Sequence, residues 1–150
     1  RTLLLIAAAH GHKQLVELLL KRGAETDARD GKDCTALMAA ARWGYGQVAE
    51  MLLRHGAGIN LQDREGGTAL MSAALEGHER VADLLIQHGA EINLQASDGC
   101  TALTCAAFHG HPPAVLQLLR AGADMALRTA DGKTALQIAK EKGHTECVEA

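Results

Sequence analysis

Histidine and cysteine are the residues of this chain whose chemistry is easiest to weigh, because both bind metals. The 150 residues contain eight His and four Cys. Four histidines, His12, His78, His111 and His144, follow a glycine at intervals that are multiples of 33 residues. A zinc site needs four ligands within ~2 to 2.3 Å of one point, whereas equivalent positions on packed helices lie ~8 to 10 Å apart. We therefore interpret these histidines as scaffold residues and expect no metal site.

The cysteines also lack a spacing that would join them in disulfides. Cys34 and Cys100 lie at the same position two periods apart, too far for the ~4.4 to 6.8 Å between Cα atoms that a disulfide requires. Cys105 and Cys147 have no evident partner. Free thiols persist in reducing compartments, so the sequence favours the cytoplasm or the nucleus.

No arrangement typical of an enzyme is present. The chain lacks a Gly-rich phosphate loop, a nucleophile elbow and a single cluster of acid, base and nucleophile. Its formal net charge of -3 argues against nucleic acid as a partner. No apolar run approaches the ~20 residues that a membrane span needs. We expect a chain without catalysis, cofactor, bound nucleic acid or membrane span.

A repeat of 33 residues organises the whole chain without insertion or deletion. A threonine opens each copy, and a glycine follows nine residues later. The two registers are Thr2, Thr35, Thr68, Thr101 and Thr134, and Gly11, Gly44, Gly77, Gly110 and Gly143. We expect a single repeat domain over residues 1–150, with repeats at approximately 1–29, 30–62, 63–95, 96–128 and 129–150.

Each copy predicts two short helices followed by an extended, turn-rich segment. In the third copy, Thr68 can cap a first helix, and Gly77 and Gly89 can end the first and second helices. The apolar stripes of the two helices are Leu70, Ala73 and Ala74, and Val81, Leu84 and Leu85. Only 2% of residues are aromatic, which suits close-packed helices. The predicted fold class is all-α, a solenoid of stacked helix-turn-helix units with projecting β-hairpin or turn loops.

The segments TALMSAALEGH and VADLLIQHGAEIN, repeated in constant register, resemble the ankyrin repeat. The resemblance covers the whole chain. One departure is the family's Thr-Pro-Leu-His, which reads Thr-Ala-Leu-Met here in two copies, so packing by Met38 and Met71 is expected in place of the motif histidine. Asp33 is a second departure, because the left-handed turn position that it fills holds Gly66, Gly99 and Gly132 in the other copies.

Both ends of the chain cut across the repeat. The sequence starts on the first helix of one copy and reaches Ala150 within the expected second helix of another. Leu3, Leu5 and Ile6 are apolar where a terminal cap would be polar. We expect further repeats on either side in a longer protein, and the alternative is a frayed start that is tolerated.

The resemblance implies a concave groove, lined by the first helices and hairpin tips, whose variable positions contact a partner. We expect Trp43, Leu75 and Phe108 to lie along one side over about 20 Å. Met38 and Met71 either join them or fold back as packing residues, and Trp43 has the same alternative. The residues at the loop tips form either a charged rim of the groove or a simple solvated edge. They are Lys32, Arg64, Glu65, Ser97, Asp98 and Lys133. The predicted contact residues are Met38, Arg42, Trp43, Met71, Leu75, Glu76, Phe108, His109, Lys32, Arg64, Glu65, Asp98, Lys133 and Glu141.

Asn60 and Asn93 occupy a hairpin position that Asp27 fills in the first copy. In the family, an Asn there with Leu eight residues before it can be a substrate of an asparaginyl hydroxylase, and Leu52 and Leu85 have that spacing. These two asparagines are therefore candidate hydroxylation sites. The alternative is that their side chains stabilise the hairpin through hydrogen bonds to the backbone.

These observations predict a non-catalytic protein-protein interaction module that binds a peptide or protein surface in the groove. We expect it to be monomeric within a larger chain. The alternative is a structural spacer or autoinhibitory segment of a larger multidomain enzyme or channel, whose groove packs on its own chain. A small-molecule site is a third, weaker reading.

Overall fold

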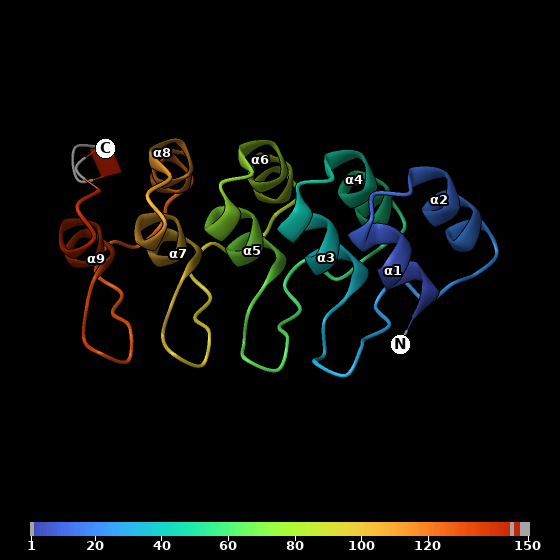
Figure 1. Ribbon diagram of the computed structural model, residues 1–150, viewed down its shortest axis with the longest axis horizontal. Helices are drawn as coiled ribbons and strands as arrows, with labels where there is room; N and C mark the ends of the chain where they lie inside the picture. The colour runs from blue at the N-terminus through green and yellow to red at the C-terminus, as the bar shows by residue number, and fades with distance from the viewer. Residues whose placement is uncertain (1, 145, 148–150) are drawn as a thin grey trace.

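The computed structural model describes residues 2–144 and 146–147, which form nine α-helices and no strands. Figure 1 shows two rows of helices, with α1, α3, α5, α7 and α9 in one row, α2, α4, α6 and α8 in the other, and the loops projecting from one side. The bounds are α1 Leu3–Ala9, α2 Lys13–Lys21, α3 Ala36–Trp43, α4 Gly46–Arg54, α5 Ala69–Glu76, α6 Glu79–Gln87, α7 Ala102–Phe108, α8 Pro112–Arg120 and α9 Ala135–Glu141. The predicted all-α stack of helix pairs is confirmed.

The second helix that we expected before Ala150 falls largely outside the described residues. Residues 146 and 147 are helical, and the rest of that segment is not described. In the described part of the chain, no helix combines the length and the apolar composition that crossing a bilayer would require.

Threonine and glycine delimit each first helix because one satisfies the first amides and the other permits the turn that follows. The Thr68 hydroxyl accepts a hydrogen bond from the Met71 amide at 3.2 Å, and Thr35 does the same for Met38 at 3.3 Å. Gly77 ends α5 in the left-handed region with φ of 73°, which a residue with a Cβ adopts only at a cost. The chain then reverses into the second helix of the same unit.

The core lies where successive first helices pack side by side across small residues. Ala73 and Ala74 of α5 have no exposed surface, and neither do Ala40 and Ala41 of α3. Larger side chains would push neighbouring units apart, since interiors are packed too densely to absorb added methylenes without strain. Leucines of the second helices, such as Leu85, complete the core from the other row.

Hydrogen bonds between neighbouring loops hold the loop tips in line. The Arg64 amide donates to the Lys32 carbonyl at 3.0 Å, and the Ser97 amide donates to the Glu65 carbonyl at 2.8 Å. The Gln62 side chain joins two loops, because its Nε2 donates to the Gln95 carbonyl at 3.2 Å as well as to a carbonyl of its own loop. The loops are therefore hydrogen-bonded turns, and no strand is assigned to them in the described residues.

Asp33 adopts the left-handed conformation expected from its register, with φ of 61° against 84° at Gly66. This confirms the turn assignment. Gly66 has a second constraint, because a Cβ on it would lie 2.9 Å from the Ala96 Cα of the next loop. The two turns thus share a backbone shape but differ in how closely the neighbouring loop approaches.

We predict that Asp33→Gly leaves the free energy of unfolding unchanged or raises it by up to about 1 kcal/mol. Removing the Cβ relieves a left-handed strain of ~1 to 2 kcal/mol, offset by the ~0.4 to 1 kcal/mol entropic cost of glycine. Urea denaturation measures the change. The control is Gly66→Asp in the same register, which should destabilise because of the close Ala96 backbone. A clear loss of stability in Asp33→Gly would contradict the turn assignment.

Candidate functional site

The groove is a hollow of about 640 Å³ between the loop tips and the first helices α3, α5, α7 and α9. It brings together most of the predicted contact residues. Those that line it are Arg42, Arg64, Glu65, Met71, Leu75, Glu76, Asp98, Phe108 and His109. The remaining predicted residues, which lie outside this lining, are Lys32, Met38, Trp43, Lys133 and Glu141.

The groove also contains residues that the sequence analysis did not select. Ser72, Cys105 and Ile138 line it from the position four residues after the opening threonine of their units. Ala39 fills that position in the second unit, so the register varies as widely as that of Leu75. This variation was the signal that could have identified them, although Ile138 is buried and Ser72 and Cys105 are only partly exposed.

The aromatic residues at the ends of first helices are exposed. Trp43 at the end of α3 is 56% exposed and Phe108 at the end of α7 is 46% exposed, while Leu75 between them is half-buried. The Arg42 guanidinium lies 5.5 Å from the Trp43 ring centroid, and the Lys142 ammonium lies 4.5 Å from the Phe108 ring centroid. Trp43 therefore does not fold back over the neighbouring helix.

Met38 and Met71 are packing residues, which corrects their expected role as contact residues. They are 5% and 6% exposed. Each stands at the third position of its helix, and a long helical side chain points back toward the turn before it. The Met38 sulfur consequently accepts a hydrogen bond from the Thr35 amide at 3.5 Å. Met71 reaches the floor of the groove but offers a partner little area.

The charged residues at the loop tips differ in what they already bind. Lys133 pairs with Glu141 at 2.9 Å, and both side chains are about half exposed. The adjacent Glu141 carboxylate raises the pKa of Lys133. The Arg64 guanidinium donates to the Gly31 carbonyl. Glu65 and Glu76 form no ion pair among the described residues, and neither do Arg42 and Arg64, so the groove carries unpaired charges of both signs.

Three of the periodic histidines, which the spacing indicated to be scaffold residues, connect neighbouring units. His78 Nε2 lies 3.0 Å from the Arg42 carbonyl, His111 Nε2 lies 3.0 Å from the Leu75 carbonyl, and His144 Nε2 lies 3.0 Å from the Phe108 carbonyl. Each ring packs on the turn glycine of the preceding unit, and a Cβ on Gly77 would come within 2.7 Å of His111. No three His, Cys, Asp or Glu side chains among the described residues are grouped to hold a metal.

The four cysteines are free thiols. Cys105 lies at the floor of the groove, and burial raises its pKa to about 12. Burial also raises the pKa of Cys34 and of Cys100. A thiol with a raised pKa keeps its proton near neutral pH and is a poor nucleophile. The cysteine in the groove therefore contributes packing and polarisability rather than covalent chemistry.

The hairpin asparagines make the backbone hydrogen bonds that the scaffold reading predicts. Asn60 Oδ1 accepts from the Glu91 amide at 2.8 Å, and Asn93 Oδ1 accepts from the Asp124 amide at 2.8 Å. Asp27 makes the equivalent bond. Hydroxylation of Asn60 or Asn93 stays a prediction, and mass spectrometry of the protein from its native cell would reveal an added oxygen.

A protein-family model described as Ankyrin repeats (3 copies) matches residues 1–63, 55–129 and 104–150, which together span the chain. No curated protein matches the chain. The matched segments contain all the helices described above, so the likeness extends over the whole scaffold.

We predict that His111→Ala lowers the free energy of unfolding by about 1 to 2 kcal/mol, because it removes the link to the Leu75 carbonyl and exposes that acceptor. His12→Ala is the matched control. His12 holds the same register but has no such carbonyl partner among the described residues, so its change should stay within ~0.5 kcal/mol. Chemical denaturation measures both. Equal losses in the two variants would contradict the linking role.

We also predict a pH dependence that Cys105 controls. Above about pH 8.5 the unfolded chain releases the Cys105 proton, whereas the folded protein holds it until about pH 12. The unfolded state then binds fewer protons, so the free energy of unfolding falls as the pH rises. Cys105→Ala places an alanine where the second unit has Ala39. Between about pH 8 and pH 10, the free energy of unfolding of this variant should fall less than that of the wild type. If the free energies of unfolding of the wild type and of Cys105→Ala change in parallel with pH, Cys105 does not titrate in this way.

Proposed function

We propose that this chain, which belongs to the ankyrin repeat family, binds an extended peptide or a protein surface in its groove and performs no catalysis. Ankyrin repeats are typically protein-protein interaction modules and are generally non-catalytic. The observation that carries the proposal is the exposure of Trp43 and Phe108 beside the groove. They are the chain's only Trp and Phe, and neither contributes to the buried core.

Aromatic exposure supports binding because burying such a side chain contributes ~1.5 to 3 kcal/mol. Trp residues are also enriched among the few positions that dominate interface energies. Phe108 lies against the His109 ring, with 5.1 Å between centroids, and both residues line the groove. Leu75 on the neighbouring helix offers a half-buried apolar surface between the two aromatic residues.

Four carboxylates and two guanidinium groups line the groove, so its net negative charge favours a partner that carries a basic side chain. Asp63 is occupied, because its Oδ1 accepts hydrogen bonds from the Glu65 and Gly67 amides at 2.9 and 2.8 Å. The carboxylates of Glu65 and Glu76 remain without an ion pair in the described residues. A Lys or Arg placed between apolar anchors would therefore meet complementary charge. Such rim contacts set specificity and association rate more than affinity.

The spacer or autoinhibitory alternative would use the same groove. Its occupant would then be another segment of the same protein rather than a separate molecule. Both readings require the groove to hold a peptide-like segment. The two proposals differ in what an added peptide meets. In the spacer or autoinhibitory alternative the peptide must compete with a segment of the same protein, whereas in the binding proposal the groove is free.

The test is selection of peptides from a random display library on the wild-type chain. We predict that the Trp43→Ala/Phe108→Ala variant weakens binding of the enriched peptides by about 100-fold, since two anchors are removed. Circular dichroism and thermal unfolding should match the wild type, because both residues are exposed. Isothermal titration calorimetry measures the affinities.

The matched control is Leu18→Ala, which removes an exposed apolar side chain from α2 in the other row of helices. Its peptide affinities should equal those of the wild type. Retention of full affinity by a folded Trp43→Ala/Phe108→Ala variant would exclude the groove as the binding site.

A further inference from the structure

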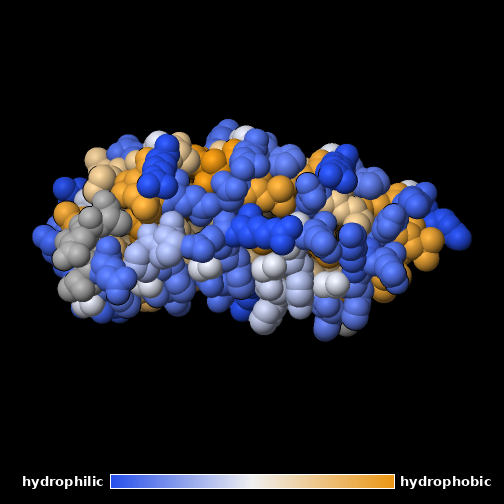
Figure 2. All heavy atoms as spheres, turned by 90° about the horizontal axis from the view of Figure 1, so that it is seen from above, coloured by the Kyte–Doolittle hydropathy of each residue, from blue (hydrophilic) through white to orange (hydrophobic). Residues whose placement is uncertain are grey.

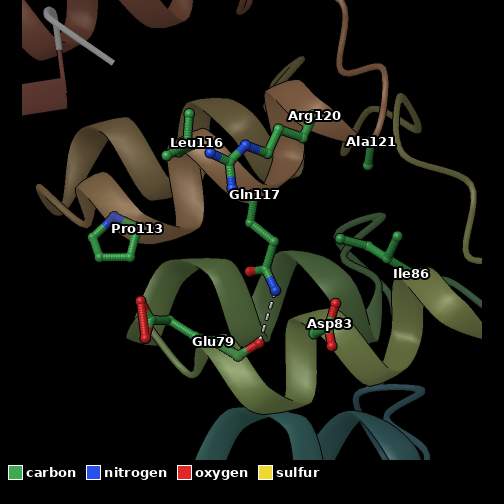
Figure 3. Close-up of a pocket in the computed structure, with 8 residues that line it drawn as sticks. All are labelled: Glu79, Asp83, Ile86, Pro113, Leu116, Gln117, Arg120 and Ala121. Carbon is green, nitrogen blue, oxygen red and sulfur yellow. Dashed lines mark hydrogen bonds between the residues drawn. The ribbon is translucent and has the colours of Figure 1, made fainter.

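A second hollow, here called the outer pocket, lies between α6 and α8 on the opposite face from the loops. Its volume is about 590 Å³, and it shares no lining residue with the groove. Figure 2, which views the molecule from the side of the second helices, shows hydrophobic patches separated by hydrophilic side chains on this face. Figure 3 shows the pocket at close range, with residues of both helices around it.

The sequence changes its pattern at the outer pocket. Leu18, Met51 and Leu84 fill one register of the second helices, but the fourth unit places Gln117 there. The preceding register carries an acidic residue in the first three units, whereas the fourth carries Leu116. The order of polar and apolar residues is thus inverted on α8 alone among the described second helices. A scaffold requirement would have kept the order that the other units share.

Gln117 places an unpaired acceptor in the pocket. Its Nε2 donates to the Glu79 carbonyl at 3.0 Å, as the dashed line in Figure 3 shows. This bond fixes the amide orientation, because the Glu79 carbonyl can only accept. The Gln117 Oε1 is then buried without a hydrogen-bond partner among the described residues. Buried acceptors in folded proteins are nearly always paired, so an orphan that lines a pocket indicates a missing donor.

The surrounding side chains define what kind of donor fits. Glu79 and Asp83 on α6 add negative charge, and neither carboxylate is in an ion pair in the described part of the chain. One Asp83 oxygen accepts from Gln87 at 2.8 Å, which leaves the other oxygen available. Pro113 and Leu116, the latter 37% exposed, provide an apolar wall on α8.

We propose that the outer pocket receives a lysine side chain of a partner protein. The aliphatic stem would lie along Pro113 and Leu116. The ammonium group has three donors and no acceptor, so it can donate to the carboxylates of Glu79 and Asp83. The Gln117 Oε1 is buried, so the side chains around it must open before the ammonium group can donate to it as well. Arg120 is the single cation in the lining and forms no ion pair among the described residues. Its guanidinium opposes the incoming charge and must turn toward solvent.

The test uses two helical peptides of Leu, Ala and Gln that differ at one central position. One carries Lys and the other norleucine, which keeps the stem and removes the charge. NMR titration of the folded chain follows the side-chain amide of Gln117. We expect the Lys peptide to shift that amide and to bind about tenfold more tightly than the norleucine peptide.

Two variants make the test specific. Gln117→Leu places a leucine where the first and third units have Leu18 and Leu84, so the variant should fold normally. It should bind the Lys peptide about tenfold more weakly than the wild type does. Arg120→Gln should increase that affinity by removing the opposing charge. Thermal unfolding of Gln117→Leu at or above the wild-type temperature confirms that the fold is intact.

The groove provides an independent control. Trp43→Ala/Phe108→Ala should bind the Lys peptide as the wild type does, so failure of the groove proposal leaves this inference standing. Equal affinity for the two peptides, or unchanged Lys-peptide affinity in a folded Gln117→Leu, overturns it. Self-association of the chain that Gln117→Leu abolishes would also overturn it, by identifying a second copy as the occupant.

Discussion

The close approach of successive first helices across alanine is the constraint on which the rest of the structure depends. Ala40, Ala41, Ala73 and Ala74 are completely buried, so only small side chains separate neighbouring units at these positions. That spacing brings each loop within hydrogen-bond distance of the next, as the 2.7 Å contact from the Ala130 amide to the Asp98 carbonyl illustrates. The groove exists because one small-residue face repeats at a constant period.

The sequence alone predicted the features that follow from this period. The helix pairs, the left-handed turn at Asp33 and the scaffold role of His111 each reflect one residue type recurring at one place, so local rules were sufficient. The direction of Met38 and Met71 required more, since both a groove-facing and a core-facing position are compatible with a variable register. The position in the helix does not settle it, because Gln137 at the same position of α9 is exposed.

The outer pocket was the least predictable feature for a related reason. The exchange of Leu84 for Gln117 is visible in the sequence, but an isolated polar residue on a second helix is ordinarily solvated. Whether its amide oxygen finds a partner depends on the separation of α6 and α8 and on the carbonyl that fixes its nitrogen. Those are three-dimensional relations between two units, and no single repeat contains them.

The histidine links have a consequence for how such a groove can change. The acceptors of the links are the backbone carbonyls of Arg42, Leu75 and Phe108. A carbonyl is the same group in every amino acid, so the bond between units is independent of the side chain that each of these positions carries. Mutation can therefore exchange the side chains at these positions one at a time while the architecture beneath them keeps its connections. Side chains at these positions can thus diverge during evolution without loss of the hydrogen bonds that hold the units together.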